Sequence, residues 1–405
     1  MRSLLRRIVL PLGIAAVSIF TFGCGSSSTP STNESSQSGS TGSTTSNVQS
    51  ITVNAGPGSD YVDGAFTSVT VCVPGSSTCQ TIDGILVDTG SPGLRILSSA
   101  LTISLPQQTN GGNPVAECGV FADGYTWGPV QTADVKIAGE VASSTPIQVI
   151  GSSNFSSIPN ECTSQGSSMD TLADLGANGL LGVGQAIQDC GSACASSGEG
   201  IYFTCPSSGC VDTTESLAQQ VQNPVASFAS DNNGVILELP SVSGAETSVT
   251  GSLIFGIGTQ SNNSLGSATV FGTDPTGNFV TTYNSAEYES FLDSGSNGIY
   301  FLNTSATGLA VCGNISFLYC PSTAQNFTVQ NSAEPGTNGA SGSVTFTVSN
   351  ADLLLNNIND TAINNLAGPS PNQFDFGLPF FFGRSVYVAI DGKSTPGGTG
   401  PYTAY

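Results

Sequence analysis

The sequence contains no histidine among its 405 residues. This absence excludes a Ser-His-Asp triad, a Cys-His pair and most catalytic zinc sites, because each of these needs an imidazole. Any acid–base chemistry must therefore rest mainly on carboxyl groups. We also find no motif for a metal ion or a cofactor, and we expect neither.

Basic residues are scarce as well. Seven Lys and Arg stand against 28 Asp and Glu, and the formal net charge is −21. Three of the seven lie in the first seven residues; the others are Arg95, Lys136, Arg384 and Lys393. A surface of this kind repels phosphate backbones, which excludes nucleic-acid binding. Few positive charges remain to repel one another at low pH, so the composition suits an acid-tolerant protein.

Segments with helical periodicity are few, and 351–366 is the best candidate. Short runs of Val, Ile, Thr and Phe are interrupted by Gly, Ser, Asn and Pro, which is typical of a β-rich protein. The length is sufficient for two domains. We expect an all-β protein with few short helices. Its predicted parts are an N-terminal lobe over 51–240, a C-terminal lobe over 241–391 and a loose tail over 392–405.

Two similar stretches organise the chain. Asp88-Thr89-Gly90-Ser91 follows an apolar run, and Asp293-Ser294-Gly295-Ser296 follows another apolar run 205 residues later. The apolar flanks are too short for helices and predict buried strands, so each Asp lies at a turn between strands. One such motif alone would indicate an ordinary β-turn. Two copies in matching frames predict that each lobe supplies one Asp to a shared site.

The first 23 residues predict an export signal, because Arg2, Arg6 and Arg7 precede an apolar run that is short for a transmembrane span. The junction at 21–24 resembles a bacterial lipobox, which implies that Cys24 carries a lipid; ordinary secretion is the alternative. Residues 24–50 are rich in Ser, Thr and Gly and predict a flexible tether. We expect an exported monomer in the bacterial cell envelope that meets the membrane only through this lipid.

Apart from Cys24 the chain has ten cysteines, an even number that an exported protein would pair in five disulfides. Cys72 and Cys79 flank a predicted hairpin and are expected to bridge it. We further expect the bridges Cys118–Cys162 and Cys312–Cys320. Two more bridges are expected within the cluster of Cys190, Cys194, Cys205 and Cys210. A four-thiolate zinc site is the alternative for this last cluster.

A glycine-rich hairpin with aromatic residues follows the first Asp motif, over 117–137. It could form a mobile cover over a cleft; equally, its Trp127 could belong to the core of an edge strand, and the sequence leaves both open. Further on, 178–184 has the glycines of a phosphate-binding loop. No helical segment follows it, so we expect a buried strand with a close backbone crossing.

In their order along 51–391, these features resemble the pepsin-like aspartic peptidases. The Asp motifs are similar to the paired catalytic motifs of that family, 178–182 and 251–256 are similar to two of its strands, and 382–391 matches its closing Phe-x-Arg-x-x-Tyr-x-x-x-Asp pattern. The resemblance implies a bilobal double β-barrel with catalytic Asp88 and Asp293. It also implies supporting roles for Thr89, Gly90, Ser91, Ser294, Gly295 and Ser296.

Two positions depart from that family. Phe121 stands where its hairpin carries Tyr, so a hydroxyl network is lost unless Tyr125 replaces it, and Arg95 stands where Trp is usual. We assign Phe121, Tyr125, Trp127 and Arg95 to the substrate cleft. The segments 86–95 and 121–128, with Cys72 and Cys79, resemble still more closely a bacterial lipoprotein family of unknown function.

The resemblance implies hydrolysis of a peptide or protein substrate by an Asp88/Asp293 pair. Two adjacent carboxyls cannot both ionise easily, so the pair holds one proton and can activate a water. One alternative is a catalytically inactive surface lipoprotein that binds peptide or glycan, which the changes at Phe121 and Arg95 favour. Another is a glycoside hydrolase, whose two carboxyls would lie at least about 5 Å apart.

Overall fold

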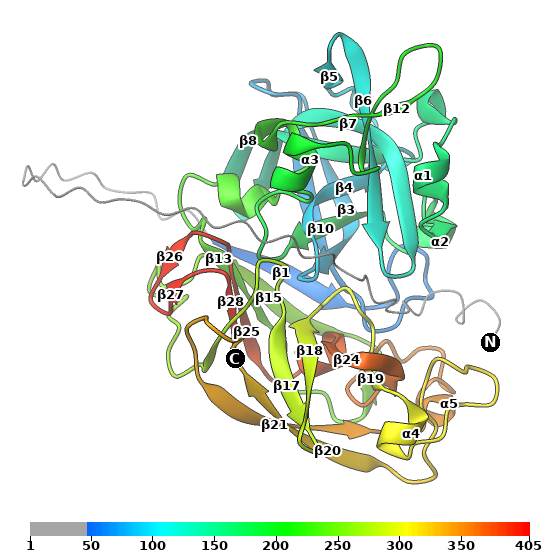
Figure 1. Cartoon of the computed structure of the whole chain (residues 1–405), viewed down its shortest axis with the longest axis vertical. Coiled ribbons are helices and arrows are strands. Elements are labelled where there is room, and N and C mark those ends of the chain that lie inside the picture. Colours follow the sequence, from blue (N-terminus) through cyan, green and yellow to red (C-terminus); the bar gives the residue numbers. More distant parts are fainter. Residues whose placement is uncertain (1–46) are drawn as a thin grey trace, which may run out of the picture.

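The computed structural model describes residues 47–405. The predicted export signal, Cys24 and the tether up to residue 46 lie outside the described residues. Within 47–405 the expected all-β class is confirmed, because strands dominate and every helix is short. Two lobes are stacked on each other, with the N-terminal one above the C-terminal one in Figure 1.

The N-terminal lobe consists mainly of antiparallel hairpins, with a few parallel pairings, that enclose an apolar core. Its strands are β2 (Ala65–Cys72), β3 (Cys79–Asp88), β4 (Pro92–Leu97), β5 (Thr109–Asn110), β6 (Asn113–Phe121), β7 (Gly124–Ile137), β8 (Glu140–Ile150), β9 (Ser167–Ser168), β10 (Gly179–Val183), β11 (Tyr202–Thr204) and β12 (Val211–Asp212). Its short helices are α1 (Asn160–Thr163), α2 (Leu172–Leu175) and α3 (Ser192–Ser196). Alternation places Val69 and Val71 of β2 in the core, fully buried.

A group of strands from the two ends and the middle of the described chain lies between the lobes. The strands are β1 (Val48–Val53), β13 (Gly234–Glu238), β15 (Val249–Phe255), β16 (Val270–Gly272), β25 (Ser385–Ala389) and β28 (Tyr402–Ala404). β1 pairs with β15, which pairs with β13, and β13 pairs with β25. The predicted lobe boundary at residue 240 therefore falls inside a shared sheet.

Two expectations about the ends were wrong. The predicted tether ends earlier than residue 50, because β1 starts at Val48 and pairs with β15. The tail over 392–405 is not loose: β26 (Ser394–Thr395) and β27 (Gly398–Thr399) form a hairpin, and β28 pairs with β25. Its apolar residues Tyr402 and Ala404 are buried, and this burial holds the tail in place.

The C-terminal lobe contains a sheet in the order β21-β20-β17-β18-β24-β19-β23. These strands are β17 (Phe279–Tyr283), β18 (Ala286–Leu292), β19 (Ile299–Leu302), β20 (Gln325–Ser332), β21 (Ser341–Val348), β23 (Ala367–Gly368) and β24 (Ser370–Phe376). A separate pair joins β14 (Ala245–Glu246) to β22 (Ala362–Ile363). Stacked and edge-to-face contacts among Phe301, Phe327, Phe346, Phe374 and Phe376 fill the core behind this sheet.

The predicted helix over 351–366 was wrong. α4 (Thr304–Thr307) and α5 (Ala351–Leu354) each make about one turn, and the chain beyond Leu354 turns back into β22 and β23. The side chain of Asn357 accepts from the amide of Asn359 at 3.2 Å and donates to Asp360 at 2.9 Å. Local bonds of this kind compete with helical backbone bonds, so the apolar spacing alone was misleading. Short 3₁₀ turns complete the fold at Ser153–Phe155, Leu217–Gln219, Pro224–Ser227 and Leu378–Phe380.

Five disulfides are present within residues 47–405, and the expected pairings are confirmed. They join Cys72 to Cys79, Cys118 to Cys162, Cys190 to Cys194, Cys205 to Cys210, and Cys312 to Cys320. A set of this size fits an exported protein, because reducing compartments keep thiols free. Among residues 47–405, none of the helices has the length and apolar character needed to cross a bilayer.

Candidate active site

The two Asp motifs occupy equivalent places in the two lobes. Asp88 ends β3, whose chain returns as β4, and β10 lies between these strands, parallel to β3 and antiparallel to β4. Asp293 follows β18, whose chain returns as β19, and β24 lies between them in the same way. Both loops therefore project from a buried three-strand frame, which fixes where each carboxyl points.

Hydrogen bonds across the lobes lock the two loops together. The hydroxyl of Thr89 donates to the carbonyl of Leu292 at 3.0 Å, and the hydroxyl of Ser294 donates to that of Val87 at 2.8 Å. Each hydroxyl also accepts a backbone amide from the opposite loop. Thr89 and Ser294 thus make reciprocal hydroxyl-to-backbone bonds, and all of these groups are buried.

Each carboxyl is held by its own loop. Asp88 accepts the amide of Gly90 at 2.8 Å and the hydroxyl of Ser91. Asp293 accepts the amide of Gly295 at 2.7 Å and the hydroxyl of Ser296 at 2.9 Å. These bonds fix the orientation of both side chains before any substrate binds.

Glycine is required at both loops because the opposite carboxyl lies against its backbone. A Cβ on Gly90 would lie 2.7 Å from the Cγ atom of Asp293, and one on Gly295 would lie 2.9 Å from Oδ1 of Asp88. Any side chain at either position would separate the two loops. The glycines expected at these positions therefore allow the carboxyls to approach each other.

The electrostatics of the pair follow from this approach. Burial, the nearby Asp88 charge and a hydrogen-bonding contact with Asp88 together raise the pKa of Asp293 to about 8. Asp293 therefore retains a proton at acidic and neutral pH. A direct hydrogen-bonding contact is also much closer than the separation that a glycoside hydrolase needs, which argues against that alternative.

The hairpin β6–β7 extends from the N-terminal lobe toward the C-terminal lobe (Figure 1). Phe121 and Gly124 close its turn, and Asp123 lies at the exposed tip. Desolvation and the charge of Asp88 both raise the pKa of Asp123, and the influence of Asp88 indicates that the tip lies near the carboxyl pair. The β6–β7 hairpin therefore lies where a cover over the carboxyl pair would lie.

Tyr125 and Trp127 do not face the cleft, contrary to our assignment. Successive residues of a strand face opposite sides, so Tyr125 and Trp127 share one face of β7. Both are buried there in a cluster with Phe203 and the Cys118–Cys162 bridge, and the indole of Trp127 donates to the carbonyl of Phe155 at 2.6 Å. Trp127 is thus a core residue, and Tyr125 does not supply the missing hydroxyl.

Arg95 is likewise not a cleft-lining residue, because it is 3% exposed. Its guanidinium pairs with Glu117 of β6 and with Asp189, 3.2 Å away, and it lies over the ring of Phe121 at 5.4 Å. The two departures from the peptidase pattern, Arg95 and Phe121, are therefore in contact. Through these contacts Arg95 links the β6–β7 hairpin to the rest of the N-terminal lobe.

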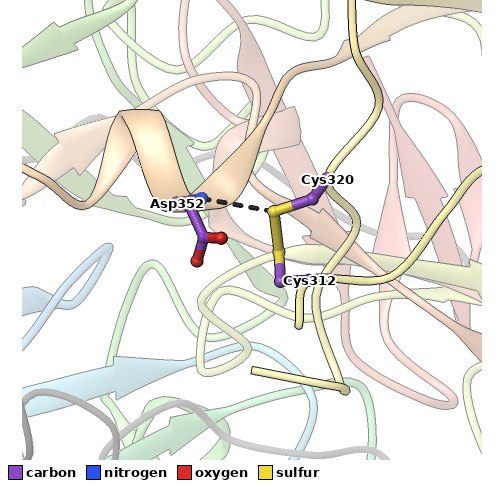
Figure 2. Close-up of side chains that lie close together, drawn as sticks. All are labelled: Cys312, Cys320 and Asp352. Atoms are coloured by element: carbon purple, nitrogen blue, oxygen red, sulfur yellow. Dashed lines mark hydrogen bonds between the residues drawn. A yellow bond between two sulfur atoms is a disulfide. The ribbon is translucent and has the colours of Figure 1, made fainter. Parts of the chain in front are cut away.

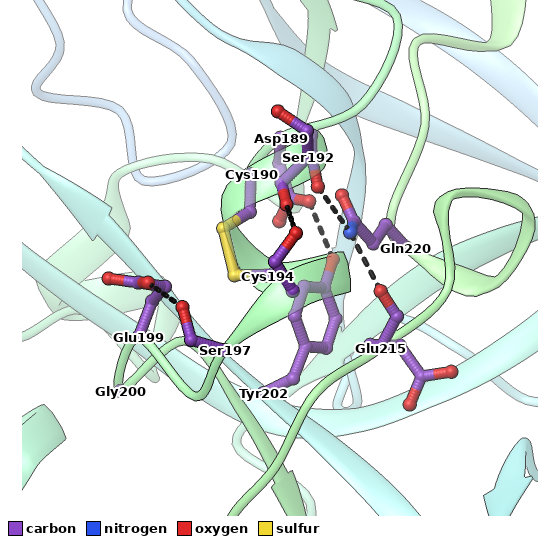
Figure 3. Close-up of a disulfide and its surroundings, with 12 residues drawn as sticks. Asp189, Cys190, Ser192, Cys194, Ser197, Glu199, Gly200, Tyr202, Glu215 and Gln220 are labelled. Atoms are coloured by element: carbon purple, nitrogen blue, oxygen red, sulfur yellow. Dashed lines mark hydrogen bonds between the residues drawn. A yellow bond between two sulfur atoms is a disulfide. The ribbon is translucent and has the colours of Figure 1, made fainter. Parts of the chain in front are cut away.

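A buried network continues from this ion pair. The hydroxyl of Tyr202 donates to Asp189 at 2.6 Å, beside the Cys190–Cys194 disulfide (Figure 3). Burial raises the pKa of Glu117 well above its ordinary value, although the Arg95 charge acts in the opposite direction. The alternative of a zinc site at these cysteines was wrong, because all four are in disulfides.

One further grouping has the composition of a metal site. Cys312, Cys320 and Asp352 lie close together, and the amide of Asp352 donates to the sulfur of Cys320 (Figure 2). Both sulfur atoms are joined in a disulfide, so they offer no thiolate to a metal. The grouping is structural.

Sequence reasoning missed one carboxyl near the pair. Asp375 of β24 is fully buried, and both Asp293 and Asp88 raise its pKa in addition to burial. The available signal was an acidic residue inside the apolar run 374–382.

Comparisons with known proteins agree with this geometry at the level of the fold. An aspartic proteinase from Irpex lacteus has a similar structure, with a TM-score of 0.52 and 14% sequence identity over 88% of this chain and 96% of that chain. No curated protein matches the chain. Residues 43–405 match DUF3443, a family described as a protein of unknown function. Because this match spans most of the sequence, the chain belongs to the DUF3443 family, and it has the fold of a pepsin-like aspartic proteinase.

Proposed function

We propose that the protein is an aspartic-type endopeptidase that hydrolyses peptide bonds with Asp88 and Asp293. The observation that carries this proposal is the contact between the two carboxyls, each held by the glycine amide and serine hydroxyl of its own loop. An arrangement of this kind confers no evident benefit on an ordinary turn, since burying two acids together is unfavourable.

The two carboxyls have different roles in this mechanism. Asp293, whose pKa is raised to about 8 by desolvation and by the neighbouring Asp88, keeps the shared proton, and Asp88 is the carboxylate of the pair. The carboxylate of Asp88 takes a proton from a water as the water oxygen attacks the peptide carbonyl carbon. Asp293 donates its proton to the carbonyl oxygen, which becomes a hydroxyl of the tetrahedral intermediate. As the C–N bond breaks, Asp88 returns its proton to the leaving amine, and Asp293 recovers one from the intermediate hydroxyl.

We further propose that the substrate is a peptide or protein and that the enzyme acts in the bacterial cell envelope as a lipid-anchored monomer. The predicted export signal and Cys24 support this location, and the five disulfides fit it. The sheet shared by both ends of the chain supports a single polypeptide that builds the whole site.

The test is cleavage of an unfolded protein substrate by the purified protein from pH 3 to pH 7. Asp88→Asn and Asp293→Asn should each reduce kcat at least about 10³-fold, because each removes one partner of the acid–base pair. Asp174→Asn, at an exposed carboxyl of α2, is the matched control and should keep full activity. A hydroxyl-containing transition-state analogue should block the wild type.

A non-catalytic peptide- or glycan-binding role is the second candidate. The contact between Arg95 and Phe121 favours it, because it replaces the hydroxyl-bearing hairpin of the peptidases with a clamped apolar one. Full activity in either Asp→Asn variant would contradict the peptidase mechanism. Tight peptide binding without turnover at any pH, unchanged in both variants, would establish the binding role instead.

A further inference from the structure

The frames of the two Asp motifs can be compared position by position. Asp88 aligns with Asp293, so Arg95, seven residues later, aligns with Tyr300. In the N-terminal lobe Leu86 and Arg95 both pair with Leu180 of β10. In the C-terminal lobe Phe291 and Tyr300 both pair with Asp375 of β24. Asp375 therefore occupies the position of Leu180, and an acid replaces an apolar side chain behind one of the two carboxyls.

No group around Asp375 in the described chain compensates the cost of burying its carboxyl, as would be expected for a residue that only supports the fold. Its side chain is fully buried, and neither carboxyl oxygen has a hydrogen-bond partner. Its neighbours along the strand, Phe374 and Phe376, face the aromatic core on the other side. An unpaired buried carboxyl is unfavourable, and the equivalent Leu180 shows that the frame forms without one.

The four groups that face Asp375 come from three elements. They are Asp293 from the loop after β18, Ser296 beside it, Tyr300 from β19, and Asp88 from the N-terminal lobe. No Lys or Arg of the described chain is among the groups that shift the pKa of Asp375, so no cation compensates a negative charge there. Beyond Tyr300 the next titratable groups are Tyr61, Asp63 and Asp123, which are also acidic. Burial and the surrounding acids therefore favour the protonated form of Asp375.

Ser296 connects this proton to the candidate dyad. Its hydroxyl donates to Oδ2 of Asp293 at 2.9 Å, which leaves its oxygen free to accept. The nearby Ser296 hydroxyl lowers the pKa of Asp375, against the larger raising effect of burial. A small rotation of the Asp375 side chain would give the chain Asp375–OH to Ser296 to Asp293. Such a chain strengthens the bond that Asp293 receives, because linked hydrogen bonds polarise one another.

We propose that Asp375 is a positioning residue of the active site, a third carboxyl that holds a proton and acts on Asp293 through the hydroxyl of Ser296. This inference rests on the proposed peptidase function of the same site. When Asp293 gives up its proton during the reaction, Asp375 stabilises the negative charge that develops on Asp293 and keeps Ser296 oriented toward it. Leucine at this position would support the fold but not this hydrogen bond.

The test compares the pH profile of kcat/KM in the wild type, Asp375→Leu and Asp375→Asn. Leucine removes the donor, so both limbs of the profile should move to higher pH by about half a unit or more. Asparagine keeps an N–H donor and should shift the limbs less. If Asp375 were instead ionised, either substitution would move the limbs to lower pH. Unmoved limbs, or limbs at lower pH, would overturn the proposal.

Asp63→Asn is the matched control. Asp63 is equally buried and has one carboxyl oxygen without a partner, but neither Asp88 nor Asp293 is among the causes of its raised pKa. Its substitution should leave both limbs of the profile in place. Asp375→Leu should also raise Tm by a few degrees, a gain that a structurally required carboxyl would not show.

A second readout separates this proposal from the peptidase function. The titration of Asp293 can be followed by NMR with ¹³C-labelled aspartate carboxyls, assigned with Asp293→Asn. If the wild type cleaves nothing but Asp375→Leu or Asp375→Asn raises the pKa of Asp293, the peptidase function fails and the coupling stands. If the wild type is active and neither the limbs nor the Asp293 titration move, the function stands and the role of Asp375 fails.

Discussion

The amide of Thr89 donates to the hydroxyl of Ser294 at 3.1 Å, and the amide of Ser294 donates to the hydroxyl of Thr89 at 2.9 Å. The two residues are 205 positions apart and belong to different lobes. Each hydroxyl also donates to a carbonyl of the strand that leads into the opposite motif. The lobes are therefore joined at the carboxyl pair, so the fold and the geometry of the site depend on the same four bonds.

Thr89→Val tests this joint while it preserves the side-chain volume. It removes one acceptor and one donor and leaves the amide of Ser294 and the carbonyl of Leu292 buried without partners. We expect a loss of about 2–4 kcal/mol in the free energy of unfolding, measured by urea denaturation. Ser294→Ala should cost a similar amount, and the double variant should cost less than the sum, because the bonds are shared. Thr81→Val, at an exposed threonine pair, is the control. A loss below about 0.5 kcal/mol in the free energy of unfolding would contradict the claim that these bonds join the two lobes.

Stability should fall as pH rises. The pKa of Asp293 is raised from 3.8 to about 8, so the folded protein holds a proton that the unfolded chain releases near pH 4. This contribution is complete below about pH 4 and is lost as pH rises toward 8, at up to about 1.4 kcal/mol per pH unit. Burial raises the pKa of Asp375 in the same direction. Thermal unfolding from pH 4 to pH 8 should show a declining Tm, and Asp293→Asn should flatten the decline. A Tm that rises over this range would contradict the assignment.

Removal of Arg95 should be strongly destabilising. Arg95→Met leaves Glu117 and Asp189 buried without their cation, at a cost of about 3–5 kcal/mol in the free energy of unfolding. The double variant Arg95→Met/Glu117→Gln should recover part of this loss, because one orphaned charge is gone. Lys136→Met, at a half-exposed lysine, serves as the control. If the single variant were as stable as the wild type, Arg95 would not anchor the hairpin.

The disulfides should differ in their contribution according to the loop that each one closes. Cys118 and Cys162 are 44 residues apart, whereas Cys190 and Cys194 are 4 apart. Chain entropy then predicts that paired Cys→Ala substitutions cost about 4 kcal/mol for the first bridge and about 2 kcal/mol for the second. Urea unfolding of the two double variants measures both values. Equal losses would indicate that packing, and not loop closure, sets the effect.

Local patterns predicted what depends on neighbours in sequence. Alternation and turn residues indicated the β class, and the spacing of cysteines indicated the short bridges. The same reasoning failed at 351–366, where apolar spacing suggested a helix but asparagine side chains favour turns. It also failed at the C-terminus, where polar and glycine residues hid a strand whose partner, β25, precedes it by about a dozen residues.

The aromatic residues of the β6–β7 hairpin show what local sequence patterns could not predict. Tyr125 and Trp127 were grouped with Phe121 because all three are aromatic and close in sequence. The side of β7 that faces Phe203 and the Cys118–Cys162 bridge depends on chain segments far away, so their burial was not predictable from the hairpin itself.

The sequence by itself determined the chemistry available to this protein. With no histidine and few bases, acid–base chemistry is left mainly to carboxyls, and two repeated Asp motifs in apolar frames predict which ones. Only the tertiary structure decided the pairing of Arg95 with Phe121 and the place of Asp375 behind Asp293. Both relationships join strands far apart in sequence, and burial, which sets the proton on Asp293 and Asp375, exists only once those strands are packed.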